Sequence, residues 1–327
     1  MKRVLIGIFL VLLIVATANL FPGRAQKASA PIPQPPANSA ASNPLKVALL
    51  KWYPANLTTN FKVGKSPLGV AFDGANIWVA NQYGVSVTKL RASDGQNLGT
   101  FTTGYGPTGV AFDGANIWTA NEFDNSVTKL RASDGKVLGT FPVGKTPQFL
   151  AFDGEAMWVT NSEGFSVSKL RASDGKTLGT FPDTLGPDGI VFDGTYIWVS
   201  NFQDTVTRFK LNGKQAGTFK VGLGPRPMAF DGANVWVSNL GDSNVTKLRA
   251  SDGVTLGTFP VPLNGFGIAF DGTAMWIAGV PDIVELRPSD GKLIFRARLP
   301  RSAEGAVAFD GANLWVVNYS DNSVSKL

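Results

Sequence analysis

The chain has 327 residues and a formal net charge of +6, and it contains neither histidine nor cysteine. The lack of cysteine excludes disulfides and thiol chemistry, and the lack of histidine removes the commonest metal ligand and the usual general base near neutral pH. Lysine and arginine are spread along the sequence rather than clustered, which argues against a nucleic-acid partner.

Residues 1–21 have the composition of an export signal. Lys2 and Arg3 precede an apolar run that extends to Ala16, and the small residues around Ala18 suit a signal peptidase. An uncleaved membrane anchor is the alternative, because extending the run to Phe21 reaches the ~18 residues that a membrane span begins to need. We expect an exported protein, either periplasmic, on the cell surface or secreted, with no membrane contact beyond such an anchor.

Residues 22–50 are rich in proline, alanine and serine. Such a segment buries too little apolar surface to fold and its prolines favour extended conformations, so it is predicted to be a linker. Residues 51–327 remain for the folded domain.

A Phe-Asp-Gly turn followed by tryptophan recurs seven times. The phenylalanines lie 38 to 40 residues apart, at Phe72, Phe112, Phe152, Phe192, Phe230, Phe270 and Phe309. This period, with short β-prone runs between turn residues, is typical of propeller blades. In the second repeat the runs are Gly109–Phe112, Asn116–Ala120, Ser126–Arg131 and Val137–Phe141. The sequence predicts an all-β, seven-bladed propeller with four antiparallel strands in each blade.

The seventh repeat contains only three strands, and the missing strand is predicted at the other end of the domain. Asn56–Gly64 matches Lys136–Gly144, the outer strand of an earlier repeat. We expect residues 54–64 to complete the last blade and close the ring, which also covers an exposed strand edge.

Residues that recur in each repeat are interpreted as scaffold. The tryptophans are expected to fill the wedges between blades, the aspartates of Phe-Asp-Gly to stabilise turns, and the asparagines after the second strand to bond the backbone of their own loops. Basic residues on the third strand are interpreted as a solvated flank that Glu285 interrupts. They are Lys89, Lys129, Lys169, Arg208, Lys247 and Lys326, with Arg91, Arg131, Arg171, Lys210, Arg249 and Arg287 two residues later.

The runs Trp78-Val-Ala-Asn81, Trp158-Val-Thr-Asn161 and Trp198-Val-Ser-Asn201 precede a Ser-Val or Thr-Val strand, and in the first two an Asp-Gly turn and a Gly-Thr-Phe strand follow. This order resembles the YVTN-type repeat and the wider NHL group of bacterial propellers, and is similar to the virginiamycin B lyase (streptogramin lyase) fold. The resemblance implies a propeller scaffold. In the lyases it implies a histidine base with a divalent metal, which this chain cannot reproduce without histidine.

Positions that differ between repeats indicate where a ligand binds. The residue that opens each inner strand lies at the mouth of the central channel, which gives the candidate ligand-binding residues Thr108, Gln148, Asp188, Arg226 and Phe266, together with Glu304. The loops between the second and third strands carry aromatics on the same face, which gives the candidate partner-binding residues Tyr83, Phe123, Phe165, Phe202 and Tyr319.

The function most compatible with these features is a non-catalytic module that binds a protein, a glycan or a small molecule through its variable loop face. We expect a monomer that needs no cofactor and no metal, and we assign no catalytic residue. The alternative is a lyase-like or other metal-assisted lyase or hydrolase that uses acidic residues in the channel, such as Asp188 and Glu304.

Overall fold

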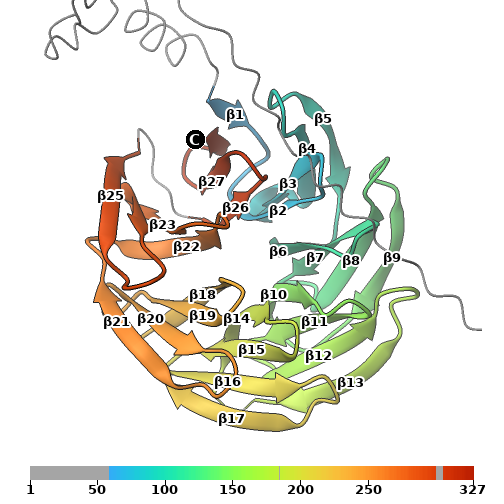
Figure 1. Cartoon of the computed structure of the whole chain (residues 1–327). Coiled ribbons are helices and arrows are strands. Elements are labelled where there is room, and N and C mark those ends of the chain that lie inside the picture. Colours follow the sequence, from blue (N-terminus) through green and yellow to red (C-terminus); the bar gives the residue numbers. More distant parts are fainter. Residues whose placement is uncertain (1–58, 184, 300–304) are drawn as a thin grey trace, which may run out of the picture. The chain divides into compact units, whose positions relative to one another are not determined.

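The computed structural model describes residues 59–183, 185–299 and 305–327, which form a ring of seven four-stranded antiparallel sheets (Figure 1). The predicted all-β, seven-bladed propeller is confirmed. The expected signal segment 1–21 and linker 22–50 lie outside the described residues.

Each blade runs from an inner strand at the channel to an outer strand at the rim of the ring. Blade 1 contains β2 (Pro67–Phe72), β3 (Asn76–Asn81), β4 (Ser86–Arg91) and β5 (Asn97–Thr102). Blade 2 contains β6 (Pro107–Phe112), β7 (Asn116–Asn121), β8 (Ser126–Arg131) and β9 (Val137–Pro142). Blade 3 contains β10 (Pro147–Phe152), β11 (Ala156–Asn161), β12 (Ser166–Arg171) and β13 (Thr177–Pro182). Blade 4 contains β14 (Pro187–Phe192), β15 (Tyr196–Asn201), β16 (Thr205–Lys210) and β17 (Gln215–Lys220). Blade 5 contains β18 (Pro225–Phe230), β19 (Asn234–Asn239), β20 (Asn244–Arg249) and β21 (Thr255–Pro260). Blade 6 contains β22 (Asn264–Phe270), β23 (Met275–Val280), β24 (Asp282–Leu286) and β25 (Leu293–Arg298). Blade 7 contains β26 (Val307–Phe309), β27 (Leu314–Asn318), β28 (Ser323–Lys326) and β1 (Asn60–Lys62), and a short 3-10 helix, η1 (Gln82–Gly84), lies in blade 1.

The outer strand of blade 7 comes from the N-terminal side of the domain. β1 pairs antiparallel with β28, with Phe61 opposite Val324, and the ring of Phe61 packs 5.5 Å from that of Trp315. Figure 1 shows β1 beside the C-terminal strands. The predicted closing strand is therefore confirmed for its described residues, and residues 54–58 lie outside them.

The Phe-Asp-Gly turn and the following tryptophan are held together by hydrogen bonds within each blade. In blade 1 the Asp73 carboxylate accepts from the backbone N–H of Asn76 at 2.6 Å and from the Trp78 indole N–H at 2.7 Å. The same aspartate–tryptophan bond, 2.6 to 2.8 Å long, recurs in the six other described blades. The aspartates are therefore turn residues, as predicted, and they also satisfy the buried indole N–H.

Aromatic rings fill the boundaries between blades. Trp118 is fully buried, and its ring lies 5.8 Å from that of Phe141 on the outer strand of the same blade. Phe141 in turn covers Gly175 in the next blade, so closely that a Cβ added there would lie 2.2 Å from the ring. Gly175 has a φ of +76°, which glycine adopts without strain.

The interpretation of the third-strand basic residues as a solvated flank is wrong for the first set. Lys129 is only 5% exposed. Its ammonium group lies 5.3 Å from the centre of the Trp118 ring and donates to the carbonyls of Ala172 and Ser173 in the next blade. These cations join neighbouring blades, because a buried ammonium needs acceptors. The second set does face solvent, as Arg131 does, paired with Asp134.

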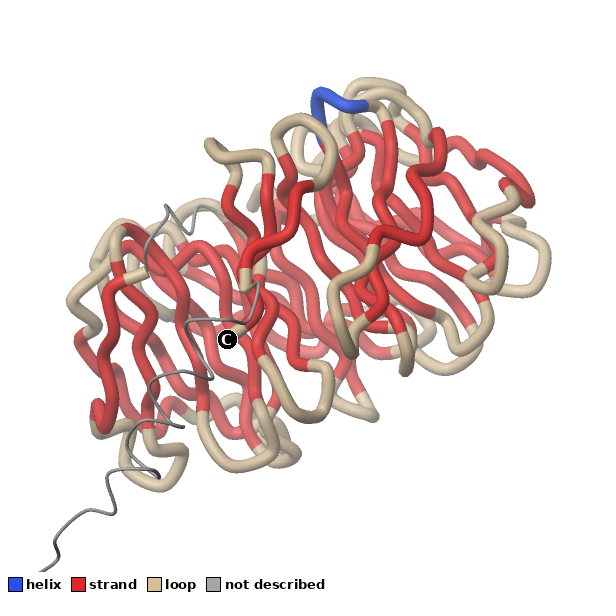
Figure 2. Tube along the Cα trace, turned by 90° about the horizontal axis from the view of Figure 1, so that it is seen from above, coloured by secondary structure: helices blue, strands red, loops and turns tan. Residues whose placement is uncertain are grey.

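The asparagines after the second strand are structural, but their partners differ from those predicted. The Asn81 side-chain amide donates to the hydroxyls of Ser86 and Thr88 on the third strand, not to the backbone of its own loop. It thus links the second and third strands at the face from which the variable loops emerge. Figure 2 shows these loops along one edge of the ring, where η1 lies, and the Asp-Gly turns along the other.

Candidate functional site at the channel mouth

A cavity of about 780 Å³ opens on the variable-loop face above the channel. Its lining comes from the openings of inner strands and from loops of blades 1 to 5, namely Leu68, Gln82, Glu122, Lys145, Thr146, Gln148, Ser162, Glu163, Phe165, Asp188, Phe202 and Arg226. Volumes of this size are typical of small-molecule sites. The cavity unites residues that the sequence assigns to two separate sites, the channel mouth and the rim loops.

Asp188 and Arg226 form an ion pair across the boundary between blades 4 and 5. The Arg226 Nε atom lies 3.3 Å from Oδ2 of Asp188. The aspartate is only 2% exposed, whereas the Arg226 side chain is half exposed. The pair therefore presents a buried carboxylate behind a guanidinium that still faces the cavity.

Burial raises the pKa of Asp188 to about 6, although the Arg226 charge lowers it and the Glu122 carboxylate adds to the increase. Desolvation disfavours the charged form of the acid, and here it outweighs the single nearby cation. The Glu122 carboxylate accepts a hydrogen bond from the Gln82 amide at 2.7 Å. Two acidic groups thus face one cavity in different environments.

Aromatic rings from the rim loops flank these charges. The guanidinium of Arg226 lies 5.5 Å from the centre of the Phe202 ring, which is 46% exposed. Phe165 lines the same cavity and is also exposed. The cavity thus offers charges of both signs beside two aromatic faces, a combination that suits a ligand with a ring and polar groups.

The other predicted rim aromatics lie outside this cavity. Tyr83 stacks on Phe123 with ring centres 6.3 Å apart, and the Tyr105 ring packs at an angle against Phe123 with ring centres 5.1 Å apart. The Tyr319 hydroxyl donates to the side-chain oxygen of Gln82 at 3.4 Å. Tyr319 thus holds a residue that lines the cavity but does not line the cavity itself.

The remaining predicted channel residues differ in position. Phe266 lines a narrower cavity of about 200 Å³ deeper in the channel, together with Gln148, Asp188 and Arg226. Thr108 lines neither cavity, since it is 2% exposed and its hydroxyl is directed to backbone carbonyls, including that of Gln148 at 2.8 Å. Glu304 lies outside the described residues.

One buried acid in the connection between blades 3 and 4 is not among the residues selected from the sequence. Asp183 follows β13 and is 1% exposed, and within the described residues its Oδ2 atom has no hydrogen-bond partner. Burial raises the pKa of this carboxyl, with the Leu185 amide and the Thr207 hydroxyl acting against it. The sequence does carry a signal, because the matching position is Val143 in blade 2 and Val221 in blade 4.

The described residues contain no group of three or more acidic side chains arranged to hold a metal ion. The metal and histidine chemistry of the lyases thus finds no matching residues in this part of the chain. Within the same described ranges, no helix is long and apolar enough to span a membrane.

The fold and the cavity define the class of protein: a seven-bladed β-propeller whose polar cavity lies at one end of the channel. No protein-family model matches the sequence, and neither does any curated protein. Many solved structures share the fold, and three of them serve as examples. A hydrazine synthase of Kuenenia stuttgartiensis has 17% identity and a TM-score of 0.69 over 80% of this chain and 95% of that one. A streptogramin B lyase has 17% identity and a TM-score of 0.69 over 82% of this chain and 95% of that one. The structure of U3-55K has 14% identity and a TM-score of 0.72 over 80% of this chain and 95% of that one. At such identities the likeness concerns the fold alone, and at that level the suspected resemblance to the streptogramin lyase is confirmed.

Proposed function

We propose that this protein is an exported, non-catalytic β-propeller that binds a small zwitterionic ligand in the cavity on its variable-loop face. The observation that carries the proposal is the joining of Asp188, Arg226 and Phe202 in one cavity of about 780 Å³. Export is proposed from residues 1–21, whose composition is that of a signal segment.

The charges around the cavity favour a ligand that carries both signs. Glu122 and Glu163 lie among the lining residues with Lys145 and Arg226, and Lys145 pairs with Glu163 at 2.8 Å. A cation and an anion on one small molecule would therefore find their counter-charges at Glu122 and Arg226. A ring between the charges would pack against Phe165 or Phe202. Amino-acid-like ligands and short peptides with free termini have this chemistry. The cavity would then present the bound molecule to a protein or glycan at the rim.

A second candidate is acid–base catalysis by Asp188. Its pKa of about 6 is suitable for a proton transfer near neutral pH. Such a reaction also requires a second proton donor or acceptor. Glu122 is the candidate, because its charge contributes to the raised pKa of Asp188. This alternative corresponds to a lyase or hydrolase without histidine.

Thermal-shift and calorimetric titrations of the full chain with Phe-Gly and Gly-Phe dipeptides test the binding proposal. At a hundred times its dissociation constant, a ligand adds about 2.7 kcal/mol of stability. We expect Asp188→Asn and Arg226→Gln to weaken binding at least about tenfold, whereas Arg131→Gln, on the outer flank, leaves it unchanged. N-acetylated and amidated dipeptides, which lack the terminal charges, should bind weakly.

Equal affinity for the charged and the blocked dipeptides would overturn the zwitterion proposal. Consumption of a dipeptide by the wild type, lost in both Asp188→Asn and Glu122→Gln, would favour the catalytic alternative instead.

A further inference from the structure

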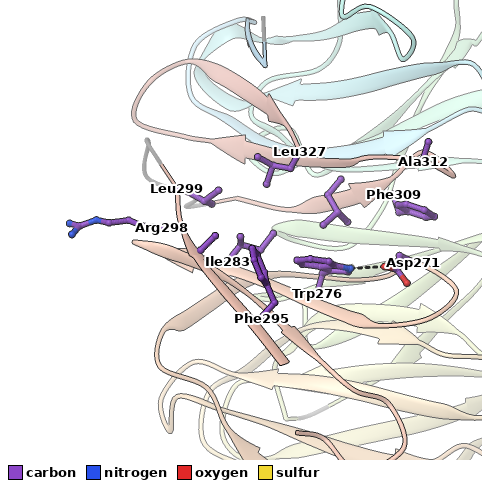
Figure 3. Close-up of a pocket in the computed structure, with 11 residues that line it drawn as sticks. Asp271, Trp276, Ile283, Phe295, Arg298, Leu299, Phe309, Ala312 and Leu327 are labelled. Carbon is purple, nitrogen blue, oxygen red and sulfur yellow. Dashed lines mark hydrogen bonds between the residues drawn. The ribbon is translucent and has the colours of Figure 1, made fainter. Parts of the chain in front are cut away.

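The boundary between blades 6 and 7 contains an apolar cavity of about 380 Å³, remote from the channel mouth. Its walls include Trp276, Ile283 and Phe295 of blade 6 with Phe309, Leu314 and Leu327 of blade 7 (Figure 3). At the other boundaries the equivalent space is filled by parts of the protein, and the reason for the difference can be read residue by residue.

The aromatic ring that fills the other boundaries is missing here. The fifth residue of the outer strand is phenylalanine in blades 1 to 5, as in β9 with Phe141, but it is Ala297 in β25. Phe295, two residues earlier, replaces the ring only in part, because it contacts Trp276 edge-on at 6.0 Å.

The neighbouring blade also contributes less at this boundary. β28 and β1 come from opposite ends of the domain, so no tight turn such as the one at Gly175 joins them. Leu327 is 46% exposed, whereas its equivalent Leu130 is fully buried. Among the described repeat tryptophans, Trp276 is the one that keeps contact with solvent.

The cation that covers tryptophan in the other blades is replaced by an acid. Glu285 lies opposite Trp276 in the pairing of β23 and β24, where blade 2 pairs Trp118 with Lys129. In the described part of the chain, no lysine or arginine lies over the Trp276 ring, and Arg298 points away from the cavity (Figure 3).

Two carboxylates therefore stand where the other blades hold a cation and an anion. In blade 3, Lys169 Nζ lies 3.1 Å from Asp153 Oδ2, which also accepts the Trp158 indole N–H at 2.7 Å. The same positions in blade 6 are Glu285 and Asp271, and Asp271 again accepts the indole N–H (Figure 3). Burial, and then the Asp271 charge, raises the pKa of Glu285.

We propose that the cavity between blades 6 and 7 binds an organic ammonium ion with an apolar body. Asp271 and Trp276 line the cavity, and Glu285 lies outside its lining, opposite Trp276 in the pairing of β23 and β24. The ammonium group replaces the missing lysine over Trp276 near these two carboxylates, while the apolar body occupies the space that phenylalanine fills in the other blades. Charge complementarity selects this ligand over a neutral or anionic one, because an anion would meet two like charges beside a low-dielectric wall.

The test is isothermal titration calorimetry of the full chain with 4-phenylbutylammonium and its neutral analogue 4-phenylbutan-1-ol. We expect the ammonium to bind about tenfold more tightly than the alcohol. Glu285→Gln should remove this preference and leave the weaker alcohol binding intact. Glu155→Gln, the same change at an exposed turn of blade 3, is the matched control and should leave both affinities unchanged.

Two further variants restore what the other blades contain. Glu285→Lys supplies the cation and Ala297→Phe supplies the ring, so each should abolish binding of the ammonium while retaining the fold, judged by circular dichroism. The proposal is overturned by equal affinity of the two probes for the wild type, by unchanged binding in both restoring variants, or by no binding to the wild type.

Discussion

The Nε atom of Arg226 lies 3.3 Å from the Oδ2 atom of Asp188, and the two residues come from neighbouring blades, 4 and 5. The contact places a nearly dehydrated carboxylate at the channel mouth with one partially solvated counter-charge. A protonation equilibrium at this position is therefore linked to the stability of the domain.

Replacement of Asp188 by asparagine should change the pH dependence of stability. The carboxyl has a pKa of about 6 in the folded protein against an ordinary 3.8, so the folded state holds this proton more tightly than the unfolded state. Its contribution is present at low pH and is lost as the pH rises from about 4 through about 6, a change of roughly 3 kcal/mol. The stability of Asp188→Asn relative to the wild type should rise by most of that amount in urea unfolding between pH 4 and 7.5. A difference that does not vary with pH would contradict the prediction.

The aspartate of the Phe-Asp-Gly turn should be far more important for stability than the aspartate of the second Asp-Gly turn in the same blade. Asp113→Ala leaves the buried Trp118 indole N–H and two turn amides without their acceptor, so we expect a loss of about 2–4 kcal/mol. Asp134→Ala removes an exposed pair with Arg131 and should have a much smaller effect. Chemical denaturation of the two variants makes the comparison, and similar losses would contradict the assigned role of Asp113.

Closure of the ring by β1 can be tested with two glycines that share a left-handed backbone. Gly95 and Gly74 have φ values of +73° and +96°, so alanine at either position introduces strain of about 1–2 kcal/mol. At Gly95 the added Cβ would lie 2.1 Å from the Phe61 ring of β1, whereas at Gly74 nothing lies within 4 Å. Gly95→Ala should therefore lower the free energy of unfolding by about 1–3 kcal/mol more than Gly74→Ala. If thermal or urea unfolding finds the two variants equally stable, the contact between Gly95 and Phe61 does not contribute to closure of the ring by β1.

The buried lysines should contribute to stability although they were expected to be solvated. Lys129→Met keeps the apolar stem but leaves the carbonyls of Ala172 and Ser173 without their donor, which should cost about 1–3 kcal/mol. Arg131→Met removes only an exposed pair and should cost less than about 1 kcal/mol. A Lys129→Met variant as stable as the wild type in urea would show that the ammonium does not join the blades.

Much of the architecture follows from the sequence because the information is local and repeated. The runs predicted for blade 2 agree with β6 to β9 within two residues at each end. The pairing of the N-terminal strand with blade 7 is predictable because one repeat lacks a strand that another part of the chain matches. The turn at Asp113 and the burial of Trp118 likewise depend on residues five apart.

The tertiary structure alone decides what happens between blades. Lys129 contacts carbonyls 43 and 44 residues further along the chain, and no periodic pattern distinguishes such a buried cation from a solvated one. The joining of Phe202 with Asp188 and Arg226 in one cavity depends on how neighbouring blades are packed. Thr108, chosen by the same positional rule, is buried because its hydroxyl reaches the backbone of the next blade. The repeat determines the strands and turns through short-range hydrogen bonds, whereas packing across the blade boundaries determines which side chains a ligand can reach.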